Sequence, residues 1–284
     1  MIPAKFDYCR ARSVGEAAAL LSEHGEAAKL LAGGHSLLPL MRLRLAVPSL
    51  LIDIGRLSEL SYVRDQGDHL AIGATTRHRD VEVSELLWSS APVLAHVAGQ
   101  VGDPQVRHRG TIGGSLAHGD PASDLPAAVL ALDGTLVVEG PGGRRDIAAA
   151  KFFTGFLETA MAPDEVLTEV RVPKVKGGWS FQKFNRRAQD WATVGVVAVG
   201  GDAEGGTRPA RVSLVNMGLT PLRARAVEEA LAAGASPVDA AERAGEGTTP
   251  PNDLNASSEF RRHLATVLVR RALEKVLVGE AAGS

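Results

Sequence analysis

The spacing of apolar and polar residues predicts a helix close to the N-terminus. Ser13 can cap this helix, Glu16 is placed three residues later as its capping-box partner, and Gly25 can end it. Between these ends the valine, alanine and leucine residues recur at the intervals that put them on one helical face. We therefore expect one amphipathic helix that packs on the strands following it.

The next apolar runs are short and predict two strands with a helix between them. Residues 28–32 and 50–54 are mostly apolar, and residues 37–45 predict a short helix that ends before Pro48. The N-terminal segment is thus expected to form a small β-α-β type unit. Its strand-to-helix connection is glycine-rich.

Short strands and helices alternate after about residue 58. The pattern predicts strands at 70–74, 135–139 and 166–172, and helices at 92–101 and 125–132. The segment 173–178, Pro-Lys-Val-Lys-Gly-Gly, is the strongest linker signal in the chain.

Beyond this linker the order of elements changes. The pattern predicts strands first and then helices, with strands at 180–184, 192–199 and 210–217 and helices at 222–232, 237–244 and 258–278. This order is typical of a compact α+β domain. We expect one domain at 1–176, with subdomains of about 1–57 and 58–176, and a second domain at 177–284.

Two glycine-rich loops carry the strongest chemical signal. The first is Ala32-Gly33-Gly34-His35-Ser36, at the end of a predicted strand, and the second is Thr111-Ile112-Gly113-Gly114-Ser115. Paired glycines let the backbone approach a ligand closely, and N–H groups exposed at a helix start favour an anion such as a pyrophosphate. The two loops together predict a long ligand that is clasped from both sides.

Either loop alone has other interpretations. A double glycine between a strand and a helix is often a plain turn. Gly34-His35-Ser36-Leu37 resembles a hydrolase nucleophile elbow, but Leu38 stands where that motif needs glycine. Neither loop has the Gly-x-Gly-x-x-Gly spacing of a Rossmann site, and no P-loop motif occurs. Asp124 is either a helix N-cap or a carboxylate that accepts hydrogen bonds from ribityl or ribose hydroxyls.

The composition excludes several classes of function. Of 284 residues, 45% are hydrophobic and the formal net charge is −2, which is typical of a globular protein and predicts no nucleic-acid partner. Cys9 is the single cysteine, so the chain alone holds no disulfide, cysteine-based zinc site or iron–sulfur cluster. The sequence has no signal-peptide core or membrane span, and we expect a cytoplasmic protein.

The polar residues suggest no independent catalytic centre. His108, His118 and Asp120 lie close in sequence, but their spacing matches no helix-face pair of metal ligands, and we expect no metal in this chain. The acids form no evident catalytic pair. A subunit of this kind depends on the chemistry of its cofactor.

Ordered motifs along the whole chain resemble the FAD-binding medium subunits of the molybdenum hydroxylase (xanthine dehydrogenase) family, and most of all those of aerobic carbon monoxide dehydrogenases. The two glycine loops carry the resemblance, together with Asp103-Pro104-Gln105, Gly119-Asp120-Pro121, Asp124-Leu125-Pro126 and Phe152-Phe153-Thr154-Gly155. The resemblance implies an α+β fold. A two-subdomain FAD-binding domain of the vanillyl-alcohol-oxidase (PCMH) type would precede a smaller α+β domain of the carbon monoxide dehydrogenase flavoprotein type.

The resemblance also implies a set of cofactor-binding residues for non-covalent FAD, namely Ala32, Gly33, Gly34, His35, Ser36, Leu37, Thr111, Ile112, Gly113, Gly114, Ser115, Asp124, Leu167, Lys183 and Trp191. No catalytic residue is implied in this chain. Lys183 is expected near the polar rim of the isoalloxazine, although an exposed strand residue is an equal interpretation. Trp191 covers a ring face or belongs to the core.

Two positions depart from the family pattern. Trp191 follows Asp190 where the carbon monoxide dehydrogenase relatives have a tyrosine. Ser115 stands where the family often has asparagine. Serine keeps a donor and an acceptor but has a shorter reach, so a direct contact could become water-bridged.

The resemblance implies partners as well. A large subunit would hold the molybdenum cofactor and a small subunit two 2Fe-2S clusters. The complex would be a dimer of heterotrimers, with quinone or NAD as acceptor. The complex would be cytoplasmic or peripheral at the inner membrane. The alternatives are a self-sufficient flavin oxidase, a medium subunit acting with aldehydes, purines or N-heterocycles, and a non-enzymatic nucleotide-binding module. His35 raises the separate question of a covalent link to flavin.

Overall fold

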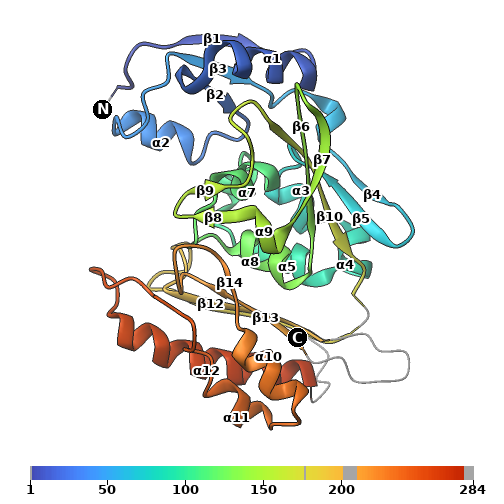
Figure 1. The fold of residues 1–284 in the computed structure, drawn as a ribbon, viewed down its shortest axis with the longest axis vertical. Helices are drawn as coiled ribbons and strands as arrows, with labels where there is room; N and C mark the ends of the chain where they lie inside the picture. The colour runs from blue at the N-terminus through green and yellow to red at the C-terminus, as the bar shows by residue number, and fades with distance from the viewer. Residues whose placement is uncertain (1, 176, 201–209, 278–284) are drawn as a thin grey trace.

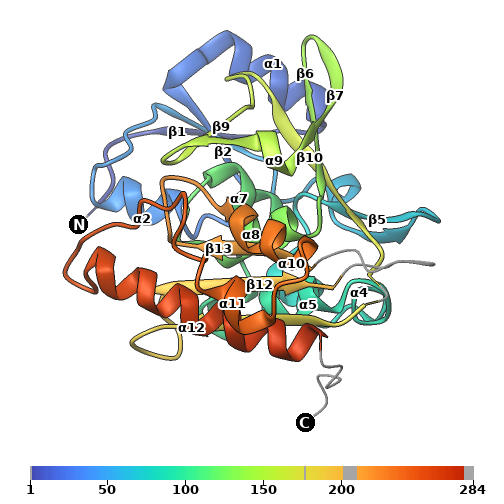
Figure 2. The same ribbon diagram turned by 60° about the horizontal axis from the view of Figure 1, so that its bottom comes forward.

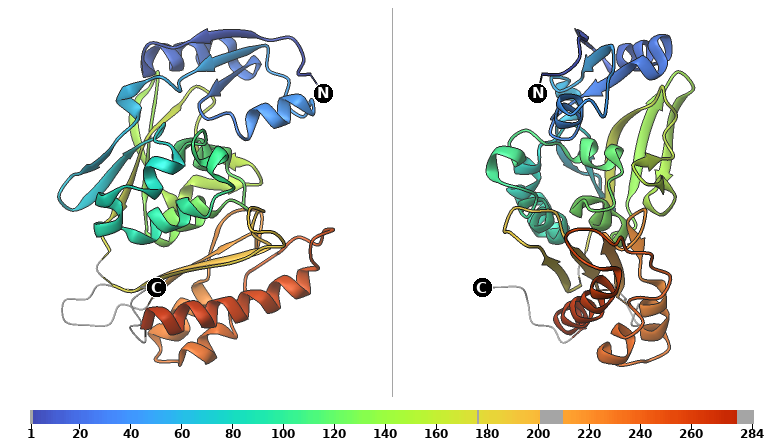
Figure 3. Two further views of the ribbon diagram at one scale, coloured as in Figure 1. Left: turned by 180° about the vertical axis from the view of Figure 1, so that it is seen from behind. Right: turned by 90° about the vertical axis from the view of Figure 1, so that its left-hand side faces the viewer.

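Three β-sheets follow one another along the longest axis of the molecule in the computed structural model (Figure 1). The structure describes residues 2–175, 177–200 and 210–277. Seen from behind and from the side, the N-terminal sheet again lies at one end and the C-terminal sheet at the other (Figure 3). The larger middle sheet and its helices separate them.

The N-terminal unit is a parallel three-stranded sheet in the order β1-β3-β2. Its elements are β1 (Asp7–Arg10), α1 (Val14–His24), β2 (Ala28–Leu31), α2 (Leu37–Arg42) and β3 (Leu50–Asp53). As predicted, Ser13 caps α1, since its hydroxyl accepts the Glu16 N–H at 3.1 Å, while the Glu16 carboxylate accepts the Arg12 N–H at 2.7 Å. Strand β1 was not predicted, because its four residues, Asp-Tyr-Cys-Arg, are mostly polar. Three of the four are exposed in the structure.

The middle sheet is antiparallel, in the order β4-β5-β10-β6-β7. Its strands are β4 (Val63–Asp65), β5 (His69–Gly73), β6 (Thr135–Gly140), β7 (Gly143–Ala148) and β10 (Val166–Pro173). Short helices pack on it, namely α3 (His78–Glu82), α4 (Glu85–Ser90), α5 (Pro92–Gly99), α6 (Pro104–Arg107), α7 (Ile112–His118), α8 (Asp124–Ala131) and α9 (Ala149–Phe152). The hairpin of β8 (Phe153–Gly155) and β9 (Glu158–Thr159) lies beside α7.

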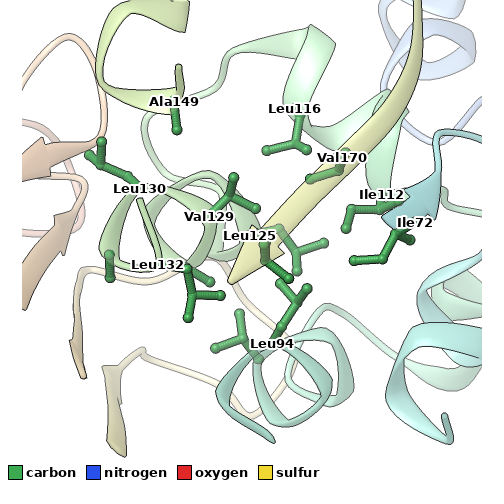
Figure 4. Close-up of a cluster of buried hydrophobic side chains, with 14 of the residues drawn as sticks. Ile72, Leu94, Ile112, Leu116, Leu125, Val129, Leu130, Leu132, Ala149 and Val170 are labelled. Atoms are coloured by element: carbon green, nitrogen blue, oxygen red, sulfur yellow. The ribbon is translucent and has the colours of Figure 1, made fainter. Parts of the chain in front are cut away.

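The largest hydrophobic core lies between this sheet and α5, α7 and α8. Leu94, Leu125 and Val170 converge there from α5, α8 and β10 and are fully buried (Figure 4). Helix α8 is buried along its whole length, because the C-terminal sheet covers its other side. This packing fixes the start of α8 in space.

The C-terminal sheet is antiparallel, in the order β11-β12-β13-β14. Its elements are β11 (Trp179–Phe184), β12 (Val194–Val199), β13 (Arg211–Val215), β14 (Leu222–Arg223), α10 (Arg225–Ala232), α11 (Pro237–Ala241) and α12 (Ser258–Leu277). Helices α10, α11 and α12 cover its outer face (Figure 2). Val196 faces them, whereas Val197 faces α8, so β12 is apolar on both faces.

The predicted helix at 222–232 is wrong in its first turn. Leu222 and Arg223 pair with Leu214 and Ser213 of β13 as a two-residue strand, and the helix begins at Arg225. The last helix is described to Leu277, so its predicted end at residue 278 lies outside the described residues. No helix in the described ranges is long and apolar enough to cross a membrane.

Candidate functional site

A cavity of about 560 Å³ lies where the three units meet. The first glycine loop, the second glycine loop, the start of α8 and the end of β11 all line it. The two predicted loops, about 80 residues apart in sequence, therefore do face one space.

The first loop, residues 32–36, connects β2 to α2 and presents its backbone to the cavity. Gly34 has a φ of 77°, and a Cβ there would lie 2.9 Å from Leu38 Cδ1. Within the described part of the chain, the N–H groups of residues 33–36 have no acceptor. Adjacent free N–H groups that line a cavity are suited to bind an anion.

The second predicted loop is the start of a helix, because Ile112 begins α7 and residues 112–115 form its first turn. Thr111 caps α7, and its hydroxyl accepts the Gly114 N–H at 3.2 Å. The N–H of Ile112 donates to Thr76 and that of Gly113 to Ala74, at 3.0 and 2.9 Å. These N–H groups are thus already bonded, and Gly113 is needed for close packing, since a Cβ would lie 2.5 Å from Ala74 Cβ.

The two loops touch each other. A Cβ on Gly33 would lie 2.4 Å from the carbonyl oxygen of Arg109 and 2.8 Å from Gly110 Cα. The guanidinium of Arg77 donates to the carbonyls of His108 and Arg109, at 2.8 and 3.3 Å, and holds that segment in place. The loops therefore form one continuous wall, in which Gly33 allows the close approach.

Asp124 at the start of α8 and Lys183 on β11 form a buried ion pair. Lys183 Nζ donates to Asp124 Oδ2 at 2.6 Å and to the Gln100 carbonyl at 3.0 Å. Their side chains are only 5% and 9% exposed, so the exposed-strand interpretation of Lys183 is wrong. The N-cap interpretation of Asp124 is also wrong, because Ser123 occupies that position.

One oxygen of this pair has no partner. Asp124 Oδ1 is buried and accepts no hydrogen bond from the described residues, although Asp124 lines the cavity. Burial raises the pKa of Asp124 to about 6, and Lys183 opposes that rise. A ligand hydroxyl would give this oxygen the hydrogen bond that it lacks.

Trp191 lies at the rim of the cavity and is 72% exposed, so the interpretation as a core residue is wrong. The loop that carries it is anchored at its base. The Thr193 N–H donates to the Phe184 carbonyl at 2.7 Å, and the buried guanidinium of Arg261 donates to the carbonyl of Thr193. Asn216 also holds this base through the Ala192 carbonyl, at 2.9 Å.

The structure brings together nearly all the predicted site residues. Those that line the cavity are Ala32, Gly33, Gly34, His35, Ser36, Leu37, Thr111, Gly113, Gly114, Ser115, Asp124, Leu167, Lys183 and Trp191. Ile112 does not, because its side chain is fully buried in the largest core. His78 and Met161 also line the cavity, but sequence reasoning missed them because each is a single residue without a motif.

The residues of the cavity fit a dinucleotide such as FAD. The free N–H groups of the first loop suit the pyrophosphate, and the unpartnered oxygen of Asp124 suits a sugar or ribityl hydroxyl. Leu167 and Met161 add apolar surface that suits flat rings. Among the described residues, no group of three His, Cys, Asp or Glu side chains is placed to hold a metal ion.

Two protein-family profiles match the chain. The FAD binding domain in molybdopterin dehydrogenase matches residues 4–175, and the CO dehydrogenase flavoprotein C-terminal domain matches residues 179–276.

Individual proteins are similar over almost the whole length. The carbon monoxide dehydrogenase medium chain of Hydrogenophaga pseudoflava is 41% identical, over 96% of this chain and 97% of its own. The 6-hydroxypseudooxynicotine dehydrogenase complex subunit alpha of Paenarthrobacter nicotinovorans is 36% identical, over 98% and 96%. A solved carbon monoxide dehydrogenase structure from H. pseudoflava, lacking the Mo-pyranopterin moiety of its cofactor, matches with a TM-score of 0.94 and 43% identity, over 98% and 99%.

Proposed function

Since the chain belongs to the FAD-binding family of the molybdopterin dehydrogenases, we propose that it holds one FAD non-covalently and relays electrons to an external acceptor. It is an oxidoreductase subunit of the molybdenum hydroxylase type, similar to carbon monoxide dehydrogenase medium chains. The observation that carries the proposal is one cavity lined both by residues 33–36, whose N–H groups have no acceptor among the described residues, and by Asp124, whose Oδ1 has no partner there.

Each part of the cavity has a role in this proposal. The first loop binds the pyrophosphate through its N–H groups, and the second loop continues the same wall, with Ser115 as an added hydroxyl. Asp124 accepts a hydrogen bond from a ribityl or ribose hydroxyl through Oδ1. Leu167 packs on a ring, and Trp191 shields the flavin from water at the rim.

Lys183 has an electrostatic role. Asp124 and the Gln100 carbonyl take two of the three N–H donors of its ammonium group, and the third is left for an anionic group at the polar rim of the flavin. When bound, FAD supplies the conversion of single electrons into a two-electron output. The chain contributes binding, orientation and the exclusion of water.

The electrons come from other subunits in this proposal. Cys9 is the only cysteine, and cluster ligation needs several thiolates. A small 2Fe-2S subunit would deliver the electrons, and a large subunit with the molybdenum cofactor would oxidise the substrate, as a dimer of heterotrimers. Quinone or NAD would accept the electrons. We place the complex in the cytoplasm, with peripheral contact to the inner membrane when quinone is the acceptor.

Isolation of the native complex tests this function. The tagged chain is purified from its own cells, and molybdenum, iron and flavin are quantified together with the co-purifying chains. Anaerobic carbon monoxide, an aldehyde and a purine are then added separately while the visible flavin band is followed. We expect both metals on partner chains and bleaching by one substrate class. A chain that purifies without either metal, and whose flavin is reduced directly by a substrate, would be a self-sufficient oxidase instead.

A further inference from the structure

His78 is a buried histidine between the two glycine loops. It is the first residue of α3, it is 4% exposed, and it lines the cavity. Its backbone N–H donates to the Gly110 carbonyl at 2.9 Å. A Cβ on Gly110 would lie 2.6 Å from the ring Cδ2 and 2.8 Å from Nε2, so the imidazole packs directly on the entry to the second loop.

The imidazole lacks hydrogen bonds inside the protein. Neither ring nitrogen has a partner within the described ranges, and of the two only Nδ1 is completely enclosed. Burial, and then the nearby His35 and Arg107, lower the pKa of His78 to about 4, so the ring is neutral near pH 7. A neutral imidazole has one donor and one acceptor, and leaving such groups unpaired in a protein interior is unfavourable.

We propose that His78 is a further FAD-binding residue, whose Nε2 hydrogen-bonds the diphosphate or the adjoining ribose between the glycine loops. The inference rests on the proposed function, because it requires a dinucleotide in this cavity. The ring packs on Gly110 at the entry to the second loop, and His35 of the first loop lines the same cavity, so the ring lies beside the part of the ligand that both loops hold. The ligand gives Nε2, the ring nitrogen that is not enclosed, a hydrogen-bond partner, and Nδ1 stays enclosed without one.

Three substitutions separate this role from a purely structural one. His78→Gln keeps a polar group near the position of Nε2, His78→Asn keeps one near Nδ1, and His78→Leu keeps neither. His108→Gln is the matched control, because His108 is exposed and does not line the cavity. Each variant is purified without cofactor, its melting temperature is measured, and FAD and FMN are titrated by flavin fluorescence.

We expect His78→Leu and His78→Asn to weaken FAD binding by about ten- to hundredfold, the usual range for one hydrogen bond to a charged group. His78→Gln should retain most of the affinity for FAD. FMN lacks the adenosine half of FAD, so its affinity should fall by a smaller factor in His78→Leu and His78→Asn. The cofactor-free His78→Leu protein should melt at or above the wild-type temperature, because an unpaired polar group has been removed.

Two results would overturn the assignment. One is an unchanged FAD affinity in His78→Leu with a normal melting temperature. The other is equal losses of stability and affinity in all three variants, which would mean that His78 only supports the fold. Failure of the wild-type chain to bind FAD would instead contradict the proposed function and is seen in the same titration.

Discussion

Lys183 on β11 reaches Asp124 at the start of α8, with 2.6 Å between Nζ and Oδ2, so one domain neutralises a buried carboxylate of the other. Removal of one member of a buried pair leaves the remaining charge uncompensated. The pair thus links the C-terminal sheet to the wall of the cavity.

Lys183→Met should destabilise the cofactor-free chain by about 3–5 kcal/mol at pH 8, because Asp124 is left charged and buried. The loss should shrink at pH 5, where protonation neutralises Asp124, whose pKa burial already raises to about 6. Urea denaturation at both pH values measures this difference. Lys174→Met is the control, since its pair with Asp65 is partly exposed and should contribute less than about 1 kcal/mol.

Gly33→Ala should separate the two glycine loops. Its Cβ would lie 2.4 Å from the Arg109 carbonyl oxygen, so the backbone must move. We expect at least about a tenfold loss of FAD affinity, because displacement of one loop misplaces its N–H groups. Isothermal titration with FAD measures the loss. Gly142→Ala, where a Cβ would meet nothing within 4 Å, should bind FAD normally; equal binding by both variants would show that the loops need not touch.

The sequence was informative where function follows a local pattern. The paired glycines, the capping of α1 by Ser13 and the long apolar strands were all predicted from nearby residues. Asp124 and Lys183 are 59 residues apart, so only the fold shows that they form an ion pair. The short strand at Leu222 continues into a helical pattern, and pairing with β13 decides its conformation.

His78 illustrates the limit of prediction from sequence. It stands between Arg77 and Arg79 in a polar segment, where its residue type alone favours an exposed position. Packing of α3 on α5 and of Gly110 on the ring buries it. The role of a single buried polar residue of this kind can be recognised only from the residues that surround it in the fold.

The buried His78 should also make the cofactor-free chain less stable in mild acid. Its folded pKa, about 4, lies below its ordinary value of 6.5, so the unfolded chain binds the proton first. The contribution of neutral His78 to the free energy of unfolding is fully present above pH 6.5. It is lost as the pH falls toward 4, and the loss is about 3 kcal/mol at most. The free energy of unfolding of His78→Leu should therefore fall less over this range than that of the wild type.

The pH dependence of stability that Asp124 causes has the opposite sign over part of this range. Its folded pKa, about 6, is raised from 3.8, so its contribution is present below pH 3.8 and is lost as the pH rises through 6. Both proteins contain Asp124, so its effect cancels in the difference between wild type and His78→Leu. Parallel pH profiles for the two proteins would contradict the assignment of His78 as a buried neutral base.

Trp191→Ala should expose bound flavin without unfolding the chain. The side chain is 72% exposed, so its removal should change stability by no more than about 0.5 kcal/mol. Because Trp191 lines the rim of the cavity, we expect iodide to quench the fluorescence of bound flavin more strongly in the variant. Trp88→Ala is the control outside the cavity. Equal quenching in both variants would show that Trp191 does not cover the bound flavin.

Non-covalent FAD binding between the two glycine loops is tested most directly by one absorbance experiment. The purified chain is incubated with FAD, freed of excess ligand and precipitated with acid. We predict the visible flavin spectrum at one FAD per chain before precipitation, and a yellow supernatant over a colourless pellet afterwards. A chain that takes up no flavin, or a pellet that keeps the colour through a covalent link such as one to His35, would contradict this account.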